Sequence, residues 1–247
     1  MKILAIDTSA VVASAALCED ETPIAVYSQK AGLNHSGTML PIVKNILDNT
    51  GTTIDDVDIL AVSAGPGSFT GIRIGIATIK GLGFGKNKIC IGVSTLEAMA
   101  RNIAAFATDA LICPVMDARR GQLYNAIFEW HSGELIRLAP DRLIDAKDLA
   151  TELAAYDKPV YFTGDGYDIM ARMLLPFHRE TPKNARWQSG YGVAMAALHT
   201  YETAEDKSVF TDKLLRPEYL RLPQAEREAN ERAEREKQHP STENVEK

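Results

Sequence analysis

Two short stretches of the chain carry residues that could handle a phosphate group. Asp7, Thr8 and Ser9 end an apolar run at the N-terminus, and the loop 65–71 (Gly-Pro-Gly-Ser-Phe-Thr-Gly) follows the apolar run 59–64. Glycines let another backbone or a phosphate come close, and free N–H groups at a helix start favour an anion. A carboxylate could orient a magnesium-bound water. These residues indicate a weak nucleotide-binding site formed by Asp7, Thr8, Ser9, Gly65 and Gly67.

The glycine loop matches neither of the named phosphate-binding motifs. A P-loop has Lys-Ser or Lys-Thr after its last glycine, whereas Gly71 is followed by Ile72-Arg73. A dinucleotide loop has glycine where Thr70 stands. The alternative is a tight turn that packs a helix onto a sheet, and the residues alone leave both readings open.

Residues that could hold a metal or act as a nucleophile show no useful spacing. The five histidines form no zinc-ligand pattern, the three cysteines lie far apart, and no Gly-x-Ser-x-Gly sequence occurs. We therefore expect no metal site and no catalytic residue. ATP and magnesium could bind in a cleft but are not expected to be turned over, and a metallopeptidase activity has the least support from the residues.

A charged turn at 117–121 carries Arg119 and Arg120. Arginines suit phosphate contacts, so this turn could touch RNA or a protein partner. A solvated turn held by an Asp–Arg contact would have the same sequence.

The elements that must position these residues follow a repeated order. Apolar runs and turn residues predict strands and helices in the order β-β-β-α-β-α-β, at 2–7, 11–17, 24–29, 37–49, 59–64, 72–84 and 88–93. The order returns at 111–116, 122–130, 134–138, 146–156 and 160–162. Ser36, Ser94 and Ser189 are expected to cap helices, the last one running to about residue 202. The pattern predicts an α/β fold with two similar lobes.

Three segments are expected from this repeat. The first lobe covers 1–107, and the helix 190–203 packs back onto it. The second lobe covers 108–222 and is reduced, because few residues separate the Gly164-Asp165-Gly166 loop from the last helix. The charged segment 223–247 has almost no large apolar side chain and is expected to be a mobile tail.

The helices 37–49 and 72–84 carry more apolar surface than one core contact requires. The first has a wide apolar stripe, and the second is apolar nearly all round, so it must be covered on both sides. Either the chain itself or a second subunit covers them. We expect a partner interface formed by Met39, Leu40, Val43, Ile46, Leu47, Ile72, Gly75, Ile76 and Ile79.

Composition narrows the class of protein. The chain has 247 residues, a net charge of −6 and 24% charged residues, with no dense Lys/Arg stripe. This disfavours tight independent binding to nucleic acid. No apolar run reaches the roughly 20 residues that span a bilayer, and the N-terminus does not resemble a signal peptide. These features predict a cytoplasmic protein with no membrane contact.

Several segments taken together resemble one family. They are residues 3–9, the loop and helix 65–75, the segment 93–98 and the turn 117–121. This set closely resembles the TsaB (YeaZ) family, which is needed to make N6-threonylcarbamoyladenosine (t6A) in tRNA, and the resemblance covers about residues 1–222. It implies a duplicated ATPase fold of the actin and Hsp70 type.

The resemblance also implies a partner role. Members of this family are similar to the catalytic subunit TsaD, whose two metal-binding histidines would fall at Thr95 and Met99 here. It implies a non-catalytic scaffold that binds and activates a TsaD-like subunit through first-lobe helices, and that also forms a homodimer. A TsaE-like ATPase is expected in the complex, and tRNA contact only through that complex.

Overall fold

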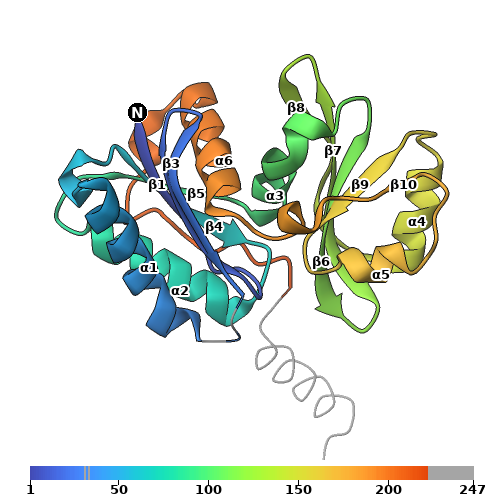
Figure 1. Ribbon diagram of the computed structural model, residues 1–247, viewed down its shortest axis with the longest axis horizontal. Coiled ribbons are helices and arrows are strands. Elements are labelled where there is room, and N and C mark those ends of the chain that lie inside the picture. The colour runs from blue at the N-terminus through green and yellow to red at the C-terminus, as the bar shows by residue number, and fades with distance from the viewer. Residues whose placement is uncertain (31, 33, 222–247) are drawn as a thin grey trace, which may run out of the picture.

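The computed structural model describes residues 1–30, 32 and 34–221, and two five-stranded sheets organise this part of the chain (Figure 1). The charged tail predicted at 223–247 lies outside the described residues. The first lobe has the predicted element order. Its elements are β1 (Lys2–Asp7), β2 (Ala13–Glu19), β3 (Thr22–Gln29), α1 (His35–Thr50), β4 (Ile59–Gly65), α2 (Phe69–Gly83) and β5 (Ile89–Ser94).

The second lobe repeats this order with shorter last elements. Its α5 and β10 have five and two residues, where α2 and β5 have fifteen and six. The lobe consists of β6 (Leu111–Arg119), β7 (Gln122–His131), β8 (Glu134–Asp145), α4 (Ala146–Ala154), β9 (Val160–Thr163), α5 (Tyr167–Ala171) and β10 (His178–Arg179).

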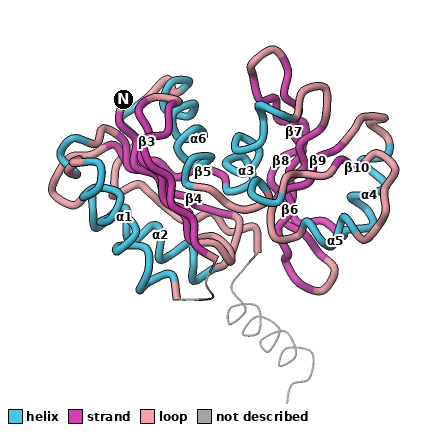
Figure 2. The backbone as a smooth tube through the Cα atoms, viewed as in Figure 1, coloured by secondary structure: helices cyan, strands magenta, loops and turns pink. Residues whose placement is uncertain are grey.

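Corresponding strands take corresponding places in the two sheets. The first sheet has the order β3-β2-β1-β4-β5, and the second has β8-β7-β6-β9-β10. β1 pairs antiparallel with β2 and parallel with β4, with Ile3 opposite Ile59. β6 has the same two kinds of neighbour, β7 and β9. The first strand of each lobe therefore lies at the centre of its sheet (Figure 2).

Two further helices lie between the sheets (Figures 1 and 2). They are α3 (Thr95–Ile103) and α6 (Gly190–Thr203), and they contact each other. α6 packs on the first sheet although it follows the second lobe in the chain. Leu96, Met99 and Ile103 of α3 share a core with β6 and β7 of the second lobe. The expected boundary at residue 107 therefore does not separate the two cores.

The inner strands of each sheet are buried on both faces, whereas the outer strands β3 and β8 are mostly exposed or half-buried. In the first sheet, α1 and α2 cover one face and α6 covers the other. This explains why β1, β2 and β4 are almost continuously apolar rather than alternating. Short 3₁₀ helices connect the elements at Ile54–Asp56, Ala104–Phe106, Lys183–Ala185 and Lys207–Val209.

Side-chain caps set where the helices begin. Ser94 accepts a hydrogen bond from the N–H of Glu97 (3.1 Å), and Ser189 caps α6 in the same manner, as predicted. α1 differs, because Asn34 is its cap and accepts from the N–H of Ser36 (3.1 Å). Ser36 lies inside the first turn, where its own N–H is one of the donors that need a partner.

Candidate functional site

Asp7 ends β1 and is completely enclosed by its own chain. Its carboxylate accepts hydrogen bonds from the N–H of Ser9 (2.8 Å) and the hydroxyls of Ser9 (2.7 Å) and Ser63 (2.5 Å). Burial raises the pKa of Asp7 above its ordinary value, and these hydrogen bonds oppose that shift. With 0% of its surface exposed, this carboxylate joins β1 to β4 and is not open to a ligand.

Thr8 and Ser9 face the glycine loop rather than solvent. The Thr8 hydroxyl donates to the carbonyl of Gly71 (2.7 Å), and the N–H of Ser68 donates to the carbonyl of Ser9 (2.6 Å). A β-carbon on Gly67, whose φ is +159°, would lie 2.5 Å from that Ser9 carbonyl oxygen. The structure thus brings together the residues predicted to bind nucleotide, and they pack on one another. Nucleotide binding by them stays a prediction.

The positions where the TsaD-like histidines would fall are buried. Thr95 has no exposed surface and its hydroxyl has no hydrogen-bond partner among the described residues. Met99 packs in the core beneath the second sheet. Within the described residues, no three His, Cys, Asp or Glu side chains come together in a way that could hold a metal ion.

The residues predicted to form a partner interface divide into two groups. Leu40 is 52% exposed and Leu47 is partly buried. The other seven lie in the first-lobe core: Met39, Val43, Ile46, Ile72, Gly75, Ile76 and Ile79. These seven are covered within the single chain, although Val43 also lines a surface pocket between α1 and α2, and their contact with a partner stays a prediction.

The reason is that α1 and α2 cover each other. They lie side by side on one face of the first sheet, so the sheet and the neighbouring helix together bury the wide apolar stripe (Figure 1). The amphipathic pattern of a helix shows how much of its surface is apolar, but it does not show what covers the apolar surface.

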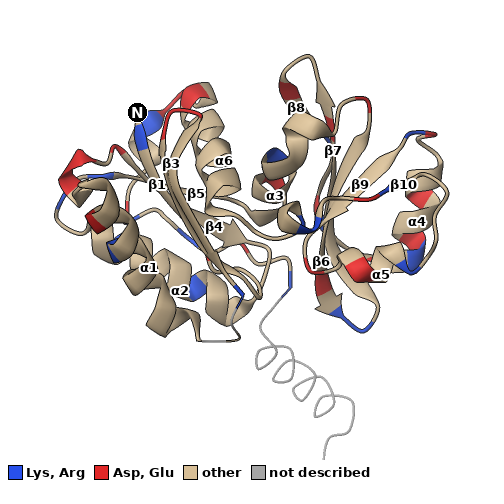
Figure 3. Ribbon diagram, in the orientation of Figure 1, with Lys and Arg blue, Asp and Glu red and all other residues tan. Residues whose placement is uncertain are grey.

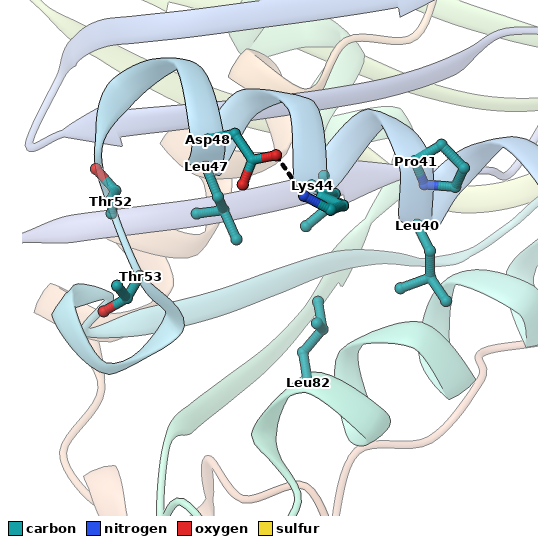
Figure 4. A pocket seen from close by; sticks show the side chains of 9 residues that line it. Leu40, Pro41, Lys44, Leu47, Asp48, Thr52, Thr53 and Leu82 are labelled. Carbon is teal, nitrogen blue, oxygen red and sulfur yellow. Dashed lines mark hydrogen bonds and ion pairs between the residues drawn. The ribbon is translucent and has the colours of Figure 1, made fainter.

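An apolar pocket remains between the two helices at the surface. This α1–α2 pocket has a volume of about 640 Å³, and Figure 4 shows Leu40 and Leu47 of α1 reaching towards Leu82 of α2. An ion pair between Lys44 and Asp48 lies on its rim. α2 carries only two charged residues (Figure 3). The full lining is Leu40, Pro41, Val43, Lys44, Leu47, Asp48, Thr52, Thr53 and Leu82.

Leu82 is the lining residue that α2 contributes, and sequence reasoning left it out of the interface. It lies on the flank of the α2 helical wheel, where the pattern alone does not separate core from surface. Its position opposite the exposed Leu40 is a property of how the helices pack.

The charged turn between β6 and β7 is exposed. Arg119 and Arg120 both have positive φ, at 70° and 58°. The guanidinium of Arg119 lies 3.5 Å from the Asp117 carboxylate, and the backbone N–H of Arg119 donates to the same carboxylate (2.7 Å). The Asp–Arg contact of a solvated turn is therefore present, and a contact with tRNA or a partner stays a prediction.

Comparison with known proteins identifies the family. The chain is 33% identical to the tRNA threonylcarbamoyladenosine biosynthesis protein TsaB of Bacillus subtilis over 232 residues, which are 92% of this chain and 96% of that protein. The chain belongs to the TsaB family. The Escherichia coli TsaB is 39% identical over 140 residues, covering 54% of this chain and 60% of that protein.

The chain is also similar to TsaD. A family model described as "TsaD: tRNA N6-adenosine threonylcarbamoyltransferase" matches residues 24–229. YeaZ from Pseudomonas aeruginosa superposes with a TM-score of 0.74 at 23% identity, covering 89% of this chain and 99% of that one. With the two repeated sheets, this confirms the predicted duplicated α/β fold with a reduced second lobe. The actin and Hsp70 type stays what the sequence resemblance implies.

None of the helices in the described part of this TsaB-family chain is long and apolar enough to cross a membrane.

Proposed function

We propose that this chain is a non-catalytic scaffold subunit in the biosynthesis of t6A in tRNA, and that it binds and activates a TsaD-like catalytic subunit through the α1–α2 pocket. Its relative in Bacillus subtilis is named for this biosynthesis. One contrast carries the proposal. The pocket is apolar and partly exposed, whereas the carboxylate that could do chemistry, Asp7, is enclosed and hydrogen-bonded internally.

Similarity to TsaD supports a partner of that kind. The TsaD family model covers most of this chain, and a tRNA N6-adenosine threonylcarbamoyltransferase of Sphingopyxis alaskensis is 40% identical over 75 residues. A partner built on the same plan would present equivalent helices. Two similar apolar surfaces can then bury each other about a pseudo-twofold axis, with Leu40 and Leu82 at the contact.

The effect of such binding is on conformer populations. A scaffold that binds the working shape of the catalytic subunit better than other shapes raises the population of the working shape. The same surface would form the homodimer, so the two assemblies compete for it. A TsaE-like ATPase and tRNA join through the complex, which agrees with the net charge of −6 on this chain.

An ATPase role of this chain alone has less support. A magnesium-bound water would need an accessible carboxylate, whereas that of Asp7 is buried and accepts hydrogen bonds from Ser9 and Ser63 of its own chain. A metallopeptidase role has no group of ligating side chains among the described residues.

Charged side chains introduced into the α1–α2 pocket test whether the pocket binds the partner. The double variant Leu40→Glu/Leu82→Glu should weaken binding to the purified TsaD-like subunit of the same organism by at least about tenfold, measured by calorimetry. Both side chains are at least partly exposed, so the variant should remain folded. The matched control is Leu174→Glu, an 86% exposed leucine of the second lobe. Binding within about twofold of the unchanged chain would contradict the proposal.

Sedimentation of the same proteins tests the homodimer. If self-association uses this surface, the double variant should be monomeric at concentrations where the control is dimeric. A dimer that survives in the double variant would assign self-association to another surface.

A further inference from the structure

The segment 211–221, called here the C-terminal strap, crosses the first lobe after α6. Its start is anchored, because Leu215 is buried in the first-lobe core and its side chain fills the space beside Gly92. Just before it, the carbonyl of Phe210 accepts from the N–H of Cys90 (3.1 Å). The strap therefore leaves β5 in a defined direction, towards the end of β4.

At the end of β4 the strap closes the glycine loop. The N–H of Glu218 donates to the carbonyl of Ala64 (2.8 Å). A β-carbon on Gly65, whose φ is +137°, would lie 2.0 Å from the carbonyl oxygen of Glu218. The strap backbone thus fills the space where a phosphate would approach this loop, and it presents a carbonyl oxygen that would repel an anion.

The N–H groups that open α2 are also engaged. The N–H of Ser68 donates to the carbonyl of Ser9 (2.6 Å), and that of Gly71 to the Ser68 hydroxyl (3.3 Å). These are among the donors through which a helix start would bind an anion. The loop is therefore occupied from both sides, by the segment that follows β1 and by the strap.

An aromatic contact holds the strap on α2. The Tyr219 ring lies 4.8 Å from the Phe69 ring between centroids, and the Tyr219 hydroxyl accepts from Nε of Arg73 (2.9 Å). The Arg73 guanidinium also lies over the Phe69 ring, at 3.8 Å. Such stacking and cation–π contacts add stability beyond apolar burial.

Two residues later the strap reaches the second lobe. The Arg221 guanidinium donates to the carbonyl of Ala118 (2.9 Å) and to Oε1 of Gln122 (3.0 Å). Both acceptors flank the β6–β7 turn that carries Arg119 and Arg120. One short segment therefore contacts the glycine loop of the first lobe and a hairpin of the second.

We propose that the C-terminal strap is an interlobe latch that keeps the glycine loop closed to phosphate-bearing ligands, and that its release from the second lobe opens this loop. Glu218, bonded to the first lobe, lies only three positions before Arg221, bonded to the second, so a change in the relative orientation of the lobes would strain these contacts. The loop and the β6–β7 turn thus open together. This inference concerns the isolated chain and does not depend on the proposed scaffold role.

Hydrogen exchange of the full chain tests the coupling. Arg221→Ala should increase exchange in two separate segments, 117–122 and 64–71. The matched control is Arg216→Ala, because Arg216 is exposed and, within the described residues, donates to carbonyls of its own segment, those of Lys213 and Leu215. Arg221→Lys keeps the positive charge but loses the guanidinium that donates to two acceptors, so it should increase hydrogen exchange less than Arg221→Ala does.

An increase confined to 117–122, or no increase, would overturn the latch, as would equal effects of the two alanine variants.

Ligand binding tests the closure. The double variant Tyr219→Ala/Arg221→Ala should bind magnesium ATP at least about tenfold more tightly than the unchanged chain, measured by calorimetry. Near-ultraviolet circular dichroism checks that the double variant keeps its packed core. If the double variant is folded and binds ATP no more tightly than the unchanged chain, the proposal is overturned.

Discussion

The carbonyl oxygen of Glu218 lies where a side chain on Gly65 would begin, 2.0 Å from the position of a β-carbon. Gly65 also has a φ of +137°, which side chains rarely adopt. The sequence predicted that either a phosphate or another backbone segment could come close to Gly65. In the structure it is the backbone of Glu218. This contact joins the end of β4 to the C-terminal strap.

We predict that Gly65→Ala lowers the free energy of unfolding by about 3 kcal/mol or more, since steric overlap adds to backbone strain. The control is Gly85→Ala, because Gly85 has a φ of +70° but nothing within 4 Å of a β-carbon. Gly85→Ala should lower the free energy of unfolding by only about 1 kcal/mol. Urea unfolding of both variants measures the difference, and equal losses would mean that the strap gives way easily at Gly65.

A second prediction separates core from surface on the two helices. Ile79 has no exposed surface, so Ile79→Ala should cost about 2–5 kcal/mol of the free energy of unfolding. Leu40→Ala should cost about 0.5 kcal/mol, because Leu40 already lies half in water. Thermal or urea unfolding gives both values. A large loss at Leu40 would show that it packs more tightly than its exposure indicates.

The enclosed carboxylate of Asp7 predicts a dependence on pH. Burial raises the pKa of Asp7 above its ordinary 3.8, so the folded chain holds this proton more tightly than the unfolded chain. Its contribution to stability is present below pH 3.8 and is lost as the pH rises through the folded pKa. Asp7→Asn has no such loss.

The free energy of unfolding of Asp7→Asn relative to the unchanged chain should therefore increase as the pH rises from about 4 to about 7. Urea titrations across that range measure it. A difference that stays constant with pH would mean that the hydrogen bonds from Ser9 and Ser63 fully offset the burial of the carboxylate.

His178 predicts the opposite trend in the second lobe. Its ring lies between Phe162 and Tyr167, at 5.2 and 5.5 Å between centroids. Burial, aided by the Arg186 charge, lowers the pKa of His178 below its ordinary 6.5. The stability that this brings is complete above pH 6.5 and is lost as the pH falls towards the folded pKa.

His178→Phe should remove this loss on acidification while keeping the aromatic packing. The measurement is urea unfolding from about pH 7.5 down to about pH 5. His131→Phe, at an exposed hairpin end, is the control and should retain the loss. If both variants retain it equally, another group is responsible.

Much of the fold could be predicted because its signals are local. The repeated order of elements, the caps at Ser94 and Ser189 and the absence of a P-loop pattern are all properties of short segments. The predicted cap at Ser36 was wrong by two residues, because Asn34 can serve equally well and the path of the chain into α1 decides between them.

The candidate site was less predictable, because its contacts join distant segments. Sequence showed that α1 and α2 carry wide apolar surfaces, yet Val43 and Ile76 are covered by the sheet and the neighbouring helix, and only the margin around Leu40 and Leu82 is left. Nothing near Thr95 in the chain indicated that α3 would pack beneath the sheet of the other lobe.

By itself the sequence determined the duplicated α/β plan, the family resemblance and the need for close approach at Gly65 and Gly67. Only the tertiary structure decided what makes that approach: Ser9, just after the N-terminal strand, and Glu218 from the other end of the described chain. The physical reason is that a glycine indicates that another group comes close to the backbone, and an apolar stripe indicates that a helix face is buried. Which segment of the chain makes that contact depends on packing between segments far apart in the sequence.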